Sequence, residues 1–207
     1  MKEASKDIFN HLLGFDLPEQ IRETLRLFLT KTRVYHKNTD IEAVVNTIRG
    51  DAVQLTLSVR SEIVAIAKTT YHQHFACEES EHGKILQATI TSALHPEMDV
   101  SHDNPSLTQV MNEPSVFEWN GDEVTLKRGE SLNYFLRYTV ERPKNDFFTY
   151  NFGSPTIYPV LRISCGDDLS VTASVPEQTI GNQYIYMKVF LVGDHIQVRW
   201  RSNTREN

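Results

Sequence analysis

The stretches LSVTASV (residues 169–175) and HIQVRWR (residues 195–201) alternate apolar and polar side chains with a period of two residues. Successive side chains of a β-strand point to opposite faces, so this rhythm predicts strands with one dry and one solvated face. The pattern indicates an antiparallel β protein. It does not by itself indicate a chemistry.

Similar patterns divide most of the chain into short strands. Turn-forming pairs separate several of them, among them Asn120-Gly121, Gly193-Asp194 and Pro143 to Asp146. We predict an antiparallel β-sandwich or a flattened β-barrel. The expected strands span residues 52–60, 62–76, 84–93, 115–119, 123–128, 131–141, 147–152, 157–165, 169–175, 183–192 and 195–201.

Residues 39–50 fit two structures. Thr39 followed by Glu42 resembles a helix capping box. The segment is also rich in β-branched residues, and Gly50-Asp51 would join it to the next strand as a hairpin. We favour the strand, because the strand at 52–60 needs a neighbour.

Residues 184–192 are apolar on both faces. Ile185 and Val189 belong to one face, and Tyr186 and Phe190 to the other. A strand with two apolar faces is expected in the centre of a layered structure or under a helix.

The two ends of the chain differ from this β pattern. Residues 5–14 and 16–30 space apolar side chains as helices do, which predicts a helical cap over residues 1–31. The β domain then covers 32–202, with an irregular connection and a potential break near 95–114, and residues 203–207 form a flexible tail. With 207 residues, of which 40% are hydrophobic, a single core is large enough to fold unaided.

Net charge and the search for targeting signals indicate which partners and which cellular location to expect. The chain has 21 Lys and Arg against 27 Asp and Glu, a formal net charge of −6, which argues against a nucleic-acid partner. Arg199, Arg201 and Arg205 are the best candidates for a local basic patch, interpreted as a solvated strand face and tail. No signal peptide or membrane-spanning segment is recognised, so we expect a cytoplasmic protein.

One histidine-rich segment has metal-ligand character. His72 and His74 share one face of a predicted strand, and Cys77 and His82 follow closely. Imidazole and thiolate groups at such spacing are zinc ligands, yet the segment lacks the paired-cysteine motif of a structural zinc site. We keep these four residues as metal candidates, and the sequence predicts no cofactor.

Aromatic residues concentrate in residues 134–158, where adjacent strands bring alternate side chains to one surface. Aromatic surfaces of this kind line ligand pockets, and they also occur in the hydrophobic core of ordinary β proteins. Nearby arginines would neutralise an anionic ligand. The predicted ligand-binding residues are Tyr134, Tyr138, Arg137, Phe148, Tyr150 and Arg162.

The order of features in the last 80 residues resembles the β-rich sensor domains of bacterial antiphage signalling. The resemblance is carried by the aromatic hairpin, by Gly153-Ser154-Pro155-Thr156 and by the terminal HIQVRW at 195–200. It implies a sensor or accessory subunit of a signalling system.

These observations give three hypotheses. The first is a non-enzymatic binding module for a small anionic ligand or a protein partner, since no catalytic motif is present. The second is an interaction subunit that docks through its N-terminal helices or an edge strand. The third is a metal-binding protein that uses His72, His74, Cys77 and His82.

Overall fold

The computed structural model describes residues 32–78, 83–110 and 116–203, and nearly all of its regular structure is β. The described strands belong to one compact unit that begins at Val34. The predicted N-terminal helices and the residues of the predicted tail beyond Asn203 lie outside the described residues. The elements are β1 (Val34–Arg49), β2 (Ala52–Ala65), β3 (Thr69–Glu78), β4 (Lys84–Thr91), the 3-10 turn η1 (Pro96–Met98), β5 (Val100–Asp103), β6 (Thr108–Gln109), β7 (Val116–Leu126), β8 (Ser131–Pro143), β9 (Asp146–Asn151), β10 (Thr156–Ile157), β11 (Val160–Cys165), β12 (Leu169–Ala173), β13 (Gln178–Ile180), β14 (Gln183–Ile185), β15 (Val189–Phe190) and β16 (His195–Ser202).

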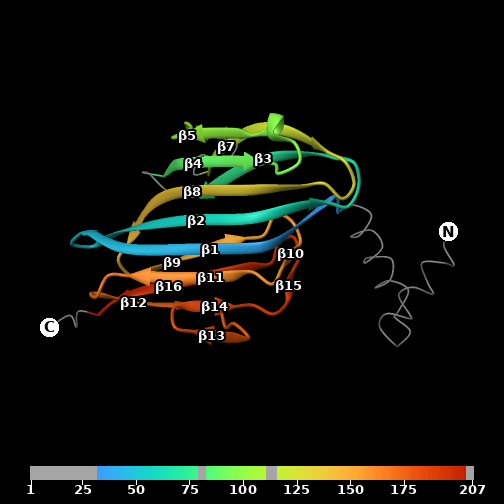
Figure 1. The fold of residues 1–207 in the computed structure, drawn as a ribbon. Coiled ribbons are helices and arrows are strands. Elements are labelled where there is room, and N and C mark those ends of the chain that lie inside the picture. Colours follow the sequence, from blue (N-terminus) through green and yellow to red (C-terminus); the bar gives the residue numbers. More distant parts are fainter. Residues whose placement is uncertain (1–31, 79–82, 111–115, 204–207) are drawn as a thin grey trace. The chain divides into compact units, whose positions relative to one another are not determined.

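One large sheet forms the first layer. Its strands follow the order β13-β14-β11-β1-β2-β8-β4-β5, with β10 beside β1 and β15 beside β10. In Figure 1 this order runs from β13 at the bottom to β5 at the top. Most pairs are antiparallel, as predicted, but β1 pairs with β10 and β11 in parallel. The ends of the sheet do not meet, so the described strands form no closed barrel.

The β1–β2 hairpin confirms the strand interpretation of residues 39–50. Ile41, Ala43 and Val45 are buried, and the residues between them are more exposed. Gly50-Asp51 forms the turn, and Arg49 pairs with Ala52 across it. The helical alternative is wrong, because only a two-residue period places all three apolar side chains on the core face.

Two three-stranded sheets, β12-β16-β9 and β3-β7-β6, form the second layer. Both cover the same face of the large sheet. The ring of Tyr138 in β8 lies 4.4 Å from the Phe75 ring in β3 and 6.3 Å from the Phe148 ring in β9. The layering is that of a β-sandwich, with the core between the layers. The outer face of the large sheet carries mainly polar side chains, among them Arg60, Arg137 and Arg162.

The predicted turn at Asn120-Gly121 is wrong. Both residues lie inside β7, where Gly121 and Asp122 together face the single residue Gln73 of β3. This is a β-bulge, which accommodates an extra residue without a reversal of the chain. Glycine is needed at position 121 because the Trp119 ring packs directly against it. A methyl group at position 121 would lie 2.5 Å from Cη2 of Trp119.

The two-sided apolar segment at 183–192 is not a central strand. It breaks into β14 and β15, and among the described strands β15 pairs only with the short strand β10. The Tyr186 N–H still donates to the Pro159 carbonyl in the register of the β11–β14 ladder, but the next N–H, that of Met187, donates to the Glu177 carboxylate instead. Tyr186 and Phe190 reach the core, whereas Met187 and Val189 are 64% and 47% exposed.

No helix among the described residues is long and apolar enough to cross a membrane.

Candidate functional site

The predicted aromatic residues meet between the two layers. Tyr134 and Tyr138 project from β8, and Phe148 and Tyr150 project from β9 toward them, with Tyr71 of β3 completing the cluster. Burial raises the pKa of Tyr150 to about 12 and that of Tyr134 well above its ordinary value. Tyr134 and Tyr138 belong to the core between the layers, and Phe148 and Tyr150 pack against it.

The two predicted arginines lie elsewhere, on the outer face of the large sheet. Arg137 alternates with the buried Leu136 and Tyr138, so its side chain points away from the aromatic cluster. Arg162 likewise alternates with buried residues and donates a hydrogen bond to Asp40. The predicted combination of aromatic wall and arginines is therefore not assembled in one place.

The histidine candidates lie on the exposed face of β3. His72 Nδ1 lies 3.2 Å from a carboxylate oxygen of Glu123, and His74 Nε2 lies 3.4 Å from one of Glu118. Each histidine is thus paired across the strands to β7. Within the described ranges, no three His, Cys, Asp or Glu side chains converge as metal ligands. Since His82 and the side chain of Cys77 lie outside what is described, the four-residue metal site stays a prediction.

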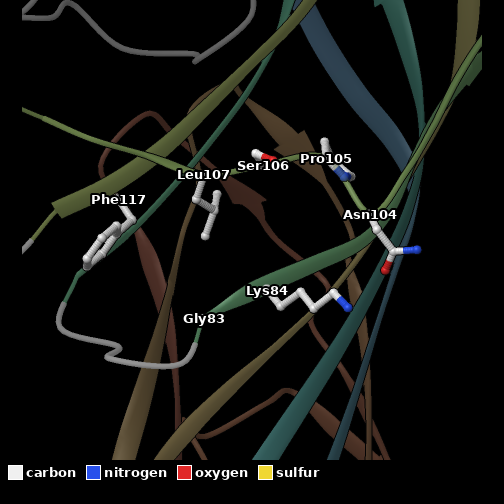
Figure 2. A pocket seen from close by; sticks show the side chains of 7 residues that line it. All are labelled: Gly83, Lys84, Asn104, Pro105, Ser106, Leu107 and Phe117. Carbon is white, nitrogen blue, oxygen red and sulfur yellow. The ribbon is translucent and has the colours of Figure 1, made fainter.

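A shallow pocket of about 350 Å³ lies near the start of β4 (Figure 2). Figure 2 shows Lys84 and Asn104 at one side of it and Leu107 and Phe117 at the other. Gly83, Pro105 and Ser106 complete the described lining. Among these described lining residues there is one cation, Lys84, and no carboxylate.

The outer face of the sheet β12-β16-β9 carries a group of five residues, four polar and one aromatic, that we call the basic face. The strand register places Thr172 of β12 beside Arg199 of β16, and Arg199 beside Phe147 of β9. Ser170 of β12 lies beside Arg201 of β16 in the same way. These five residues, Phe147, Ser170, Thr172, Arg199 and Arg201, define the basic face.

The arginines of the basic face have no acidic partner among the described residues. Within the described part of the chain, the one guanidinium hydrogen bond on this face runs from Arg199 Nη2 to Gln197 Oε1 over 3.3 Å. Neither Arg199 nor Arg201 forms an ion pair with any carboxylate of residues 32–78, 83–110 or 116–203. Asp168, the acidic residue that precedes β12, is held instead by Thr47 and Lys144, which lower the pKa of its carboxyl group.

The alternation in HIQVRWR pointed to this surface. It assigned Ile196, Val198 and Trp200 to the core and the two arginines to solvent, and the burial pattern of β16 agrees. The contribution of Phe147 was not predicted. Phe147 and Phe148 are adjacent in sequence, and nothing local shows which of the two faces the core.

Comparisons with known proteins assign no family. No family model and no curated protein matches the chain. Among solved structures, it is similar to an M1 zinc metallopeptidase from Deinococcus radiodurans, with 10% identity, a TM-score of 0.41, and coverage of 82% of this chain and 42% of that one. It is also similar to a protease described as putative from Parabacteroides distasonis, with 10% identity, a TM-score of 0.39, and coverage of 84% and 37%. The chain thus spans less than half the length of these proteins, and similarity at this level assigns it no activity.

Proposed function

We propose that the chain is a non-enzymatic binding module for a small anionic ligand, which binds on the basic face. The observation that carries the proposal is the pair Arg199 and Arg201, exposed on one strand face without a described acidic partner. In a chain with a formal net charge of −6, two such cations form a local positive site. This function would suit the sensor or accessory role that the resemblance to antiphage signalling implies.

The chemistry of the basic face matches an oxyanion. Arginine presents a planar fork of donors that binds phosphate or carboxylate oxygens in pairs. Thr172 adds a hydroxyl donor beside Arg199, whereas the Ser170 hydroxyl donates to the backbone carbonyl of Arg201 and offers a ligand only its acceptor lone pairs. The five residues of this face include no carboxylate that would repel the ligand.

Calorimetric titration with inorganic tripolyphosphate at low ionic strength tests the proposal. We expect saturable binding that weakens as salt is added, because exposed charges are screened. Replacing both Arg199 and Arg201 by alanine should weaken binding tenfold or more. Arg137→Ala is the matched control, since Arg137 is also an exposed arginine on a strand.

Two results would contradict the proposal. One is the absence of tripolyphosphate binding by the wild-type protein at low salt. The other is an equal loss of affinity in Arg137→Ala and in the double variant, which would indicate charge attraction without a site.

A second candidate function rests on a different surface. Exposed apolar side chains gather at the β10–β15 edge, and contiguous apolar surface of this kind marks protein interaction sites. We call this surface the apolar edge, and it consists of Tyr158, Met187, Val189, Leu191 and Val192. This supports the hypothesis of docking through an edge strand.

A second copy of the chain is the partner to test first, because like edges can pair antiparallel about a two-fold axis. Light scattering coupled to size-exclusion chromatography should then show a dimer, and Val189→Lys should convert it to a monomer. A wild-type protein that stays monomeric at high concentration would rule out this partner.

A further inference from the structure

We infer that the anionic ligand of the basic face is a nucleotide, whose base stacks on Phe147 while its phosphates bind the two arginines. This inference rests on the proposed function and specifies its ligand. It starts from an exposed aromatic side chain in an otherwise polar surface. Phe147 is 46% exposed, although the adjacent Phe148 faces the core.

The strand register sets the arrangement. Phe147, Arg199 and Thr172 form one row across β9, β16 and β12. Neighbouring strands lie about 4.8 Å apart, so Phe147 is one strand spacing from Arg199. Arg201 lies two residues further along β16, about 6.7 Å away on the same face. The aromatic ring therefore occupies one edge of the face, with the cations in the middle and the hydroxyl groups at the far edge.

Each part of this arrangement matches one part of a nucleotide. A flat apolar ring provides a platform on which any base can stack. Two guanidinium groups at this spacing can each bind oxygens of a polyphosphate chain. The Thr172 hydroxyl can donate to a remaining phosphate or sugar oxygen, and the Ser170 hydroxyl, which donates to the Arg201 carbonyl, can accept from a sugar hydroxyl.

The same features favour a mononucleotide over a nucleic-acid strand. Surfaces that bind single strands stack successive bases on several aromatic side chains. The basic face carries one exposed aromatic residue, Phe147. The net charge of −6 also repels a long polyanion more strongly than a small ligand.

Three probes, measured by calorimetry at one low ionic strength, test the inference. They are ATP, inorganic tripolyphosphate and a single-stranded hexadeoxynucleotide. We expect ATP to bind at least tenfold more tightly than tripolyphosphate, because only ATP has a base to stack. We expect the hexanucleotide to bind no more tightly than ATP.

Variants at Phe147 separate stacking from charge. Phe147→Ala should reduce ATP affinity about tenfold, to the level of tripolyphosphate, and leave tripolyphosphate affinity unchanged. Phe147→Leu keeps an apolar side chain and should show the same loss if the flat ring is what matters. Phe135→Ala is the matched control, because Phe135 is a partly exposed aromatic beside Arg60 on the outer face of the large sheet. Circular dichroism of each variant establishes that it is folded.

The outcomes distinguish this inference from the proposed function. Equal affinities for ATP and tripolyphosphate, with no effect of either Phe147 variant, would overturn nucleotide recognition and leave the anion site intact. Hexanucleotide affinity far above that of ATP would overturn the mononucleotide assignment. No binding of any probe would contradict the proposed function itself.

Discussion

Replacing Gln73 by methionine should stabilise the protein by about 2 kcal/mol. The Gln73 side chain is 0% exposed, on the inner face of β3 between Tyr71 and Phe75. Neither its Nε2 nor its Oε1 atom has a hydrogen-bond partner among the described residues. The amide instead lies against the bulge of β7, where a methyl group at Gly121 would be 3.0 Å from its Oε1.

The magnitude follows from the unpaired amide. An amide buried without hydrogen bonds costs about 1–3 kcal/mol in folded proteins. Methionine has nearly the same length and volume and no polar group to desolvate. In a chain of this size, about 2 kcal/mol corresponds to a rise in Tm of roughly 4–8 °C. Urea unfolding and thermal unfolding, both followed by circular dichroism, measure the two quantities independently.

Gln54→Met provides the matched control, because Gln54 is a partly exposed residue on the outer face of β2. Its substitution should leave the free energy of unfolding nearly unchanged. A Gln73→Met protein that is less stable than wild type by 1 kcal/mol or more would refute the reasoning. It would show that the amide is satisfied in solution, for example by a buried water molecule.

Two further predictions concern His36 and Gly121. Burial lowers the pKa of His36 from 6.5 to about 4. Below pH 6.5 the unfolded state therefore binds more protons than the folded state. Up to about 3 kcal/mol of stability should be lost as the pH falls from 6.5 to 4. Urea unfolding across this pH range should show a smaller loss of stability in His36→Asn than in wild type. The control His72→Asn, at an exposed site, should lose as much stability as wild type. Identical pH profiles for all three proteins would count against a neutral His36 imidazole in the folded protein. Gly121→Ala should destabilise the protein by about 1–3 kcal/mol, because its methyl group would displace the Trp119 ring. Gly50→Ala, with open space at that turn, should change little, and equal unfolding midpoints for the two variants would show that the bulge tolerates a side chain.

Within single strands, the alternation of residues predicted side-chain orientation well. It placed Tyr134 and Tyr138 on the core face of β8, and Arg199 and Arg201 on the solvated face of β16. It also favoured the correct structure for residues 39–50. In each case the residues alternate between apolar and polar, so the apolar half of the strand must be the half that faces the core.

The alternation of residues did not show which side chains of different strands come together in the candidate site. Proximity in sequence suggested that Arg137 would accompany Tyr134 and Tyr138. Yet adjacent residues of a strand point to opposite faces, and β8 has its aromatic side covered by the second layer. The basic face combines residues from β9, β12 and β16, and their pairing was not visible in the chain order.

The sequence by itself determined a mainly β protein, the faces of its regular strands and the position of the first hairpin. These properties depend on local periodicity and turn residues, which act over a few positions. Only the tertiary structure decided that Gly121 forms a bulge against Trp119, that the apolar segment at 183–192 ends at an edge, and that Phe147 joins the two arginines. Those outcomes depend on which strands pair and which sheet covers which face, and long-range packing free energy selects among pairings that local propensity leaves equivalent.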